Sequence, residues 1–204
     1  MKTARKALML ILCAALLVSA TVMGTLAYLT SETGVVTNTF TIGKVAITLD
    51  EAKVDAYGVP VANAARVYGN EYKMIGNQSY TKDPTVHIKE GSEPCYLFVK
   101  IDNEIAEIEA ATTIASQMTA NSVWTPVADG SNIYYYKDVV DAREAQQDVE
   151  VFKTFTLKSD ADLDEYAGKT IKVQAYAVQK EGFSSALDAW SKAPLAAWTT
   201  TPAE

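Results

Sequence analysis

The sequence predicts an all-β protein: an antiparallel jelly roll or β-sandwich with one or two inserted short helices, preceded by an N-terminal signal helix. Beyond Tyr28, apolar residues mostly alternate with polar ones, which is the pattern of half-buried strands. Turn signals that contain glycine and aspartate separate these segments. About 177 residues remain beyond position 27, which suffices for one domain with its own hydrophobic core.

The N-terminus has the layout of an export signal. Three cations within the first six residues precede an unbroken apolar run over residues 7–18, and small residues precede Tyr28. This pattern predicts cleavage after Ala27 and a secreted protein. A retained membrane anchor is the alternative, because the apolar stretch counted through residue 29 reaches the roughly 20 residues that a membrane-spanning helix needs.

The charge balance argues against nucleic-acid binding. The formal charge is −7, and residues 1–27 contain three cations and no acid, so the remainder carries −10. A net negative surface repels nucleic acid and anionic lipid, and the sequence shows no basic face of the kind that nucleic acid requires. Contact with a membrane is therefore expected only through the N-terminal signal segment.

Cysteine usage excludes an internal disulfide in the exported part. Only Cys95 remains beyond the signal segment, so no intramolecular pair can form. Strand alternation over residues 94–101 places Cys95 on one face with Leu97 and Val99. We interpret Cys95 as a buried thiol that acts as a small hydrophobic residue, with a reactive or intermolecular thiol as the alternative.

The pattern divides the exported chain into an extended N-terminal segment (residues 28–41), a jelly-roll β-sandwich domain (42–192) and a loosely ordered tail (193–204). The expected strands cover residues 40–49, 85–89, 94–101, 124–127, 133–136, 149–157 and 170–180. The dipeptide Asp129-Gly130 predicts a hairpin. Tyr134 and Tyr136 share a face opposite Tyr135, which we interpret as half-core, half-surface packing, with partner or carbohydrate binding as the alternative.

Two helices and one long loop are expected among the strands. Apolar residues at helical spacing predict an amphipathic helix over residues 103–119 that lies across the sandwich. A second helix begins at Ser185 with the form of a capping box, and packs Leu187 and Trp190 inward. Residues 51–82 form an irregular stretch with several glycines, and loops of this length are usually functional or mobile.

No motif assigns a catalytic, cofactor-binding or metal-binding residue. HExxH and GxSxG are absent, and His87 is the only histidine. On a strand, His87 and Glu90 point to opposite faces and cannot share a metal, so we interpret His87 as a solvated strand residue. The acidic turn with Asp162, Asp164 and Glu165 is interpreted as solvated, although a glycosidase carboxylate pair stays formally possible in an acidic β protein.

Several blocks resemble one family of exported proteins. Residues 24–30 (GTLAYLT) and 38–45 (NTFTIGKV) look like the signal region of the TasA/camelysin type, which a dedicated SipW-type signal peptidase processes in Gram-positive bacteria. The blocks at 82–86 with 91–100, and at 175–183 leading to Trp190, resemble recurrent blocks of the clostridial branch of the same group. The resemblance covers nearly the full chain and is most specific in the signal region.

The resemblance implies an exported jelly-roll domain that joins the extracellular matrix of biofilms. It implies cleavage between Ala27 and Tyr28, and fibres in which the extended N-terminus of one subunit completes the sheet of the next. Val35, Val36 and Phe40 would supply the apolar anchors of that donor strand. Pairing of this segment within its own subunit is the alternative, because strand addition leaves no mark in a single sequence.

The leading interpretation is a secreted, non-enzymatic structural protein that needs no cofactor and associates with itself or with matrix proteins. Two alternatives remain. The first is a camelysin-like secreted metalloprotease, although the chain lacks the histidine ligands that such an enzyme needs. The second is a surface protein that stays in the membrane through its N-terminal helix.

Overall fold

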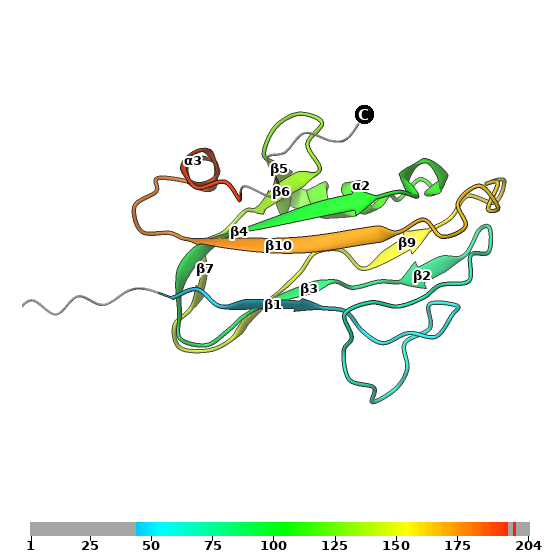
Figure 1. Cartoon of the computed structure of the whole chain (residues 1–204), viewed down its shortest axis with the longest axis horizontal. Helices are drawn as coiled ribbons and strands as arrows, with labels where there is room; N and C mark the ends of the chain where they lie inside the picture. The colour runs from blue at the N-terminus through cyan, green and yellow to red at the C-terminus, as the bar shows by residue number, and fades with distance from the viewer. Residues whose placement is uncertain (1–43, 196–197, 199–204) are drawn as a thin grey trace, which may run out of the picture. The chain divides into compact units, whose positions relative to one another are not determined.

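A computed structural model describes residues 44–195 and Trp198 (Figure 1). Strands dominate this part of the chain, all pairing is antiparallel, and two short α-helices accompany them. The all-β prediction is confirmed at this level. The strands are β1 (Ile47–Asp50), β2 (Ser79–Thr81), β3 (Thr85–Ile88), β4 (Ser92–Asn103), β5 (Trp124–Pro126), β6 (Ile133–Tyr136), β7 (Val140–Ala142), β8 (Gln147–Glu150), β9 (Thr154–Thr156) and β10 (Ile171–Gln179).

The first layer is built around β3. It pairs with β1 on one side and with β8 on the other, and His87 lies opposite Thr48 and Asp148 in this register. β2 and β9 form a separate pair, and they continue the β3–β8 ladder beyond a short interruption. The backbone N–H groups of Val151 and Lys82 bridge this interruption by donating to Pro84 and Lys153.

The second layer is built around β4, the longest strand described. It pairs with β10 along nine residues on one edge, while β6 and β7 share its other edge and β5 follows β6. The hairpin predicted from Asp129-Gly130 is therefore present between β5 and β6. Gly130 has a positive φ of 72°, a conformation that glycine adopts at little cost.

The alternation predicted along β4 and β10 sorts their residues onto two faces. Cys95, Leu97 and Val99 point into the main core between the layers, where they are fully buried. Tyr96 and Phe98 lie on the outer face, where helix α3 (Ala186–Lys192) and Trp198 cover them. Figure 1 shows the two layers and α3 outside the β4–β10 layer. The buried interpretation of Cys95 is thus confirmed.

The helix predicted over residues 103–119 is wrong. The chain forms only a 3-10 turn at Ala106–Ile108, and then helix α2 at Ile114–Thr119. Between them, Glu109 forms a β-bridge with Leu157, and the N–H of Ala110 donates to Thr156. Pairing with the neighbouring backbone therefore overrides the helical periodicity, and a new helix begins where Thr113 caps it.

Two other expectations need correction. Residues 149–157 do not form one strand, because Val151 and Phe152 are both buried in succession, which breaks the period of two between β8 and β9. Helix α3 begins after Ser185 as predicted, and the Ser185 hydroxyl accepts from the Asp188 N–H. Trp190 packs inward, but Leu187 is 45 % exposed, and Ala186 and Ala189 fill the buried positions instead.

Several predictions fall on residues outside the described part. These are the signal segment, the cleavage site at Ala27 and Tyr28, and the anchors Val35, Val36 and Phe40. The domain boundaries stay predictions. Within the segment predicted to be a tail, Trp198 is buried against the outer aromatic cluster. In the described residues, the two α-helices have six and seven residues, and no helix is long and apolar enough to cross a membrane.

Candidate functional site: a groove between two edge strands

The two layers meet on one side at β1 and β10, which are neighbours in space (Figure 1). β1 pairs only with β3, and β10 only with β4, among the described residues. Each strand therefore presents an unpaired edge toward this side. The residues of β10 that point toward the core stay only half-buried along the whole strand; they are Ile171, Val173, Ala175 and Ala177.

A cavity of about 630 Å³ opens at this side, and we call it the β1–β10 groove. Its walls are the end of β1, the segment 68–74 of the long loop and the start of β10. Its apolar lining is Leu49, Tyr72, Met74, Ile105, Phe155, Ile171 and Val173. The space is hollow because no described strand continues either sheet here.

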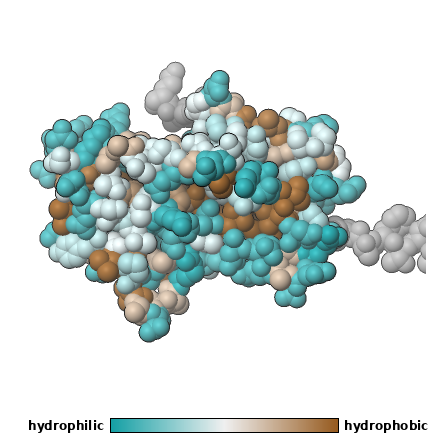
Figure 2. Space-filling view, turned by 180° about the vertical axis from the view of Figure 1, so that it is seen from behind, coloured by the Kyte–Doolittle hydropathy of each residue, from teal (hydrophilic) through white to brown (hydrophobic). Residues whose placement is uncertain are grey.

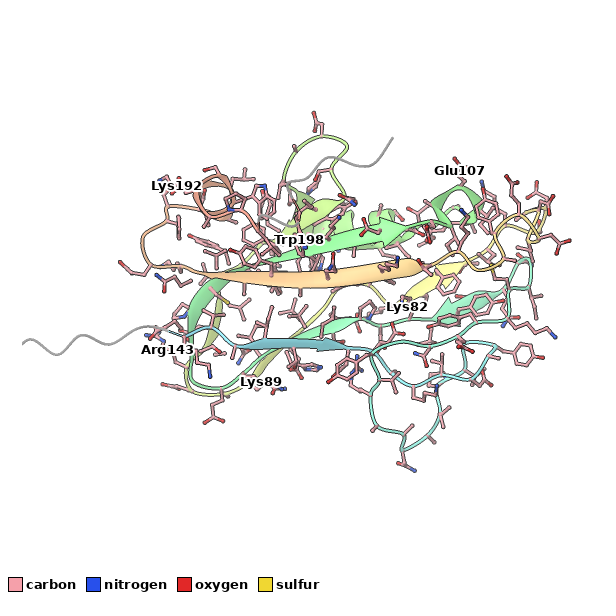
Figure 3. All side chains as sticks on the ribbon, in the orientation of Figure 1. Lys82, Lys89, Glu107, Arg143, Lys192 and Trp198 are labelled. Carbon is pink, nitrogen blue, oxygen red and sulfur yellow. The ribbon has the colours of Figure 1, made fainter. Side chains whose placement is uncertain are left out.

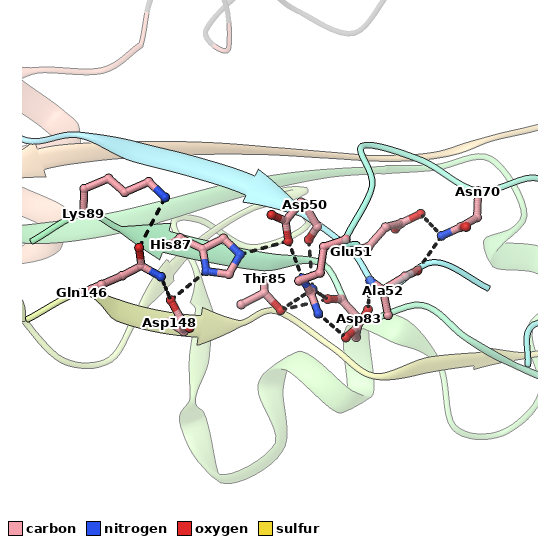
Figure 4. A network of polar contacts seen from close by, with 11 residues as sticks. Asp50, Glu51, Ala52, Asn70, Asp83, Thr85, His87, Lys89, Gln146 and Asp148 are labelled. Atoms are coloured by element: carbon pink, nitrogen blue, oxygen red, sulfur yellow. Dashed lines mark hydrogen bonds and ion pairs between the residues drawn. The ribbon is translucent and has the colours of Figure 1, made fainter. Parts of the chain in front are cut away.

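A buried ion pair forms one wall of the groove. Lys82 Nζ lies 2.5 Å from Glu51 Oε2, and both side chains are less than a tenth exposed. The other carboxylate oxygen, Glu51 Oε1, accepts from the Asn70 side-chain amide at 2.9 Å. Figure 3 labels Lys82 between the two layers, and Figure 4 shows Asn70 beside Glu51.

A second set of charges ties the long loop to the first layer. The Arg66 guanidinium forms ion pairs with Asp50 and Asp83, and also donates to the Thr85 hydroxyl. Figure 4 labels these three partners. Burial opposes the charged form of Arg66, but the bonds to the two aspartates raise its pKa. These contacts hold residues 66–70 beside the groove.

His87 is buried, so its interpretation as a solvated residue is wrong. It is 9 % exposed, and its ring lies between two carboxylates: Nε2 is 2.9 Å from Asp50 and Nδ1 is 2.7 Å from Asp148 (Figure 4). Burial lowers the pKa of His87, but the bonds to both aspartates outweigh it and raise the pKa. Cross-strand neighbours on β1 and β8 supply the partners, and sequence alternation alone cannot identify them.

The long loop also exposes apolar and aromatic side chains. Tyr57, Val59 and Val61 are about half exposed, and Tyr68, on the rim of the groove, is 93 % exposed. The side of the molecule opposite Figure 1 is mostly hydrophilic, with separate hydrophobic patches (Figure 2).

A second cavity, of about 530 Å³, lies beside α2. Glu109 is buried in its wall and accepts from the Ile114 N–H at the start of the helix. Burial raises the pKa of this carboxyl group. Glu109 thereby satisfies the first N–H of the helix, next to the N-cap Thr113, which accounts for its burial.

Sequence reasoning did not single out the polar residues of the groove. Glu51, Asn70 and Lys82 are separated by up to 31 positions, and only the fold of the irregular loop brings them together. Asp162, Asp164 and Glu165 of the expected acidic turn are exposed and lie outside the groove. Within the part of the chain that the structure describes, no group of three or more His, Cys, Asp or Glu residues is placed to hold a metal ion.

Comparisons with known proteins add no relative: no family model matches the chain, and neither the curated proteins nor the solved structures searched give a match.

Proposed function

We propose that this chain is a secreted, non-enzymatic structural protein of the cell surface or extracellular matrix, which self-associates by β-strand addition with the β1–β10 groove as the acceptor. The observation that carries the proposal is the row of half-buried apolar residues along the unpaired edge of β10. An added strand would satisfy the edge N–H and C=O groups and bury this row.

The segment before the described domain has suitable length and chemistry for a donor strand. Residues 28–41 reach about 46 Å when extended, whereas the nine residues of β10 span about 30 Å. Val35, Val36 and Phe40 would be the apolar anchors that fill the groove. The donor belongs to a second copy in this proposal, and pairing within one chain is the outcome that the experiments must separate.

We also propose that the strand connections follow a jelly roll and that the chain is of the TasA/camelysin type. A SipW-type signal peptidase would then remove residues 1–27. The small-residue sequence before Tyr28 supports the cleavage site. Mass spectrometry of the exported protein tests it: a mature N-terminus at Tyr28 agrees, and an intact N-terminus in the membrane fraction contradicts it.

Deletion of residues 28–39 tests the donor segment. We expect the truncated protein to fold as a monomer and to form no filaments under conditions in which protein that begins at Tyr28 does, as judged by electron microscopy and light scattering. Filaments that persist after the truncation would rule out this donor. A monomeric protein with residues 28–39 intact would indicate pairing within one chain.

A pair of variants on β10 tests the acceptor. Val173→Lys places a charge in the groove, whereas Gln174→Lys adds the same side chain on the opposite, exposed face of the same strand. We expect Val173→Lys to abolish assembly while circular dichroism shows a folded protein, and Gln174→Lys to assemble normally. Equal assembly by both variants would exclude the groove as the acceptor.

A further inference from the structure

Three side chains at the groove are joined by hydrogen bonds through one carboxylate. The Glu51 carboxylate contacts the Lys82 amine through Oε2 at 2.5 Å and the Asn70 amide nitrogen through Oε1 at 2.9 Å. The carboxylate thus touches both an amine nucleophile and the nitrogen of a potential leaving group. We propose that Lys82 and Asn70 form an intramolecular isopeptide bond, and that Glu51 catalyses its formation.

The burial of Lys82 needs an explanation beyond stability. A lysine is almost never fully buried unless it is paired, and a buried ion pair often contributes no more stability than apolar residues of similar size. Here the pair lies under a loop of otherwise exposed residues, with Lys82 8 % and Glu51 4 % exposed. A chemical role accounts for an amine held out of water beside an acid.

The reaction balances without any co-reactant. The Lys82 ammonium first transfers a proton to Glu51 along the hydrogen bond that joins them. The neutral Nζ then attacks Asn70 Cγ to form a C–N bond, and the resulting tetrahedral centre places negative charge on Oδ1. Glu51 gives a proton to Nδ2, the Cγ–Nδ2 bond breaks, and ammonia leaves as the amide carbonyl re-forms. Glu51 is a carboxylate again after this transfer, and it passes the extra proton of the new amide nitrogen to the departing ammonia, which leaves as ammonium.

The backbone around Asn70 stabilises the charge that develops. The Val54 N–H donates to Asn70 Oδ1 at 3.0 Å, and it can strengthen this bond as the oxygen becomes negative. The Ala52 carbonyl accepts from Nδ2 at 2.8 Å. These two partners fix which end of the side-chain amide is oxygen, because an N–H donor and a C=O acceptor demand opposite atoms.

The surroundings are aromatic on one side and open to solvent on the other, which leaves an exit for ammonia. Tyr72 and Phe155 line the groove together with the three residues. Tyr80 packs against both rings, and the three centroid separations are 4.8–5.7 Å. Burial, and secondarily the charge of Glu51, raises the pKa of Tyr72, so its hydroxyl stays neutral and donates to the Thr81 carbonyl. The groove itself connects Glu51, Asn70 and Lys82 to solvent.

The bond would give this chain the covalent staple that its cysteines do not supply. Cys95 is the only cysteine beyond the signal segment, and it is buried. A link from residue 70 to residue 82 closes a short loop, and cross-links of this kind stabilise a fold chiefly by restricting the unfolded chain. It would also fix the segment that forms the rim of the groove.

Peptide mapping of the purified full chain tests the proposal. The bond lowers the mass by one ammonia, about 17 Da, and prevents trypsin from cleaving after Lys82. We expect a branched peptide in which residues 67–73 are joined to residues 74–89 through Asn70 and Lys82. Recovery of the linear peptides 67–73 and 74–82 as the dominant products would overturn the proposal. A cyclic imide at Asn70 would also lose ammonia, but trypsin would still cleave after Lys82, and this result would count against the bond.

Four variants separate the roles. Lys82→Arg removes the nucleophile, Asn70→Ala removes the acceptor, and Glu51→Gln removes the proton carrier, so none should give the branched peptide. Lys153→Arg, which changes an exposed lysine near Glu150, should give it in full. A branched peptide from Glu51→Gln would overturn the catalytic role of Glu51. The wild-type result decides the bond even if a variant fails to fold, and it does not depend on filament formation, so this inference and the proposed function can fail separately.

Discussion

The two sides at which the layers meet differ in what covers them. On one side, β7 pairs with the first half of β4 and lies against β8; Val140, Ala142 and Val149 are at most 7 % exposed there, and we call this the closed side. On the other side, here called the open side, β1 and β10 face each other across the groove. Leu49 and Val173 occupy equivalent inward positions but are only half-buried.

The difference shows what one additional strand does for a two-layered sheet protein. β7 has only three residues, yet it extends the layer over the core, and both Cys95 and Val140 are buried there. The open side has inward residues of the same kind, but none of the described strands covers them as β7 does on the closed side. Apolar residues in that position lose the free energy of burial, roughly 25 cal/mol per Å², until something covers them.

A charge placed on each side should produce the largest contrast. Val149→Asp buries a carboxylate on the closed side and should destabilise the fold by about 4 kcal/mol or prevent folding. Val173→Asp places the carboxylate in the groove, where it can reach water. This substitution should lower the free energy of unfolding by about 1 kcal/mol. Urea denaturation of both proteins measures the difference. Similar losses at the two positions would mean that the open side is closed in solution.

Cysteine reactivity probes the closed side directly. Cys95 lies opposite Val140 of β7, and burial, with a smaller contribution from Asp141, raises the pKa of its thiol to about 11. Alkylation by iodoacetamide near neutral pH should therefore be at least about a hundredfold slower in the folded protein than in urea. Peptide-resolved mass spectrometry distinguishes Cys95 from Cys13. Fast labelling without denaturant would show that β7 opens readily.

His87 links a strand of the open side to a strand of the closed side. The substitution His87→Gln should therefore lower the free energy of unfolding by about 1–2 kcal/mol at pH 5.5. The ring bonds Asp50 of β1 and Asp148 of β8. This expected loss of stability is modest because the Asp148 side chain is 55 % exposed, so solvent screens its contact with His87. Glu144→Gln, at an exposed position, is the matched control and should have little effect.

The same network predicts a pH window. The pKa of His87 is raised above 6.5, so its contribution is complete below pH 6.5 and is lost as the pH rises through the folded-state pKa. Burial raises the pKa of Asp50, but the hydrogen bonds with His87 and Arg66 outweigh it and lower this pKa below 3.8. For Asp148, the hydrogen bond with His87 is the largest effect, and it lowers the pKa below 3.8. Their contribution is complete above pH 3.8 and is lost as the pH falls through their folded values.

The stabilising effect of the network should therefore peak between about pH 4 and 6.5. Arg66 contacts Asp50, and Gln146 contacts Asp148. Lys89 bonds Gln146, and its charge also lowers the pKa of Asp148. Proton NMR gives the folded pKa of His87 without assignment, because it is the only histidine in the chain. A value at or below 6.5 would contradict the doubly bonded ring.

Sequence periodicity predicted the strands well where each strand has a buried and a less buried face. The alternation over residues 94–101 and 170–180 matches β4 and β10, because both contribute inward residues to one core. It failed at residues 103–119, where a β-bridge at Glu109 interrupts apolar residues with helical spacing. It also failed between β8 and β9, because consecutive residues are buried where the chain crosses the interruption in the ladder.

The candidate site could be predicted only in outline. An irregular stretch over residues 51–82 was recognisable from its length and glycines, but the contacts inside it depend on tertiary folding. Glu51 and Lys82 stand at opposite ends of this stretch, and Asn70 lies between them. The burial of His87 escaped prediction for a related reason, since its partners come from neighbouring strands rather than from neighbouring residues.

The smallest expected effect on stability, at Tyr68, carries the sharpest information about the open side. Tyr68 is 93 % exposed at the rim of the groove, so Tyr68→Ala should change the free energy of unfolding by less than about 0.5 kcal/mol. If the groove accepts a strand from a second copy, the same substitution should slow filament growth, because an exposed aromatic at an interface often contributes binding free energy. Tyr57→Ala, also in the loop but outside the groove lining, is the matched control. Slower growth in Tyr68→Ala alone would locate the contact at the open side, and equal growth rates in both variants would place it elsewhere.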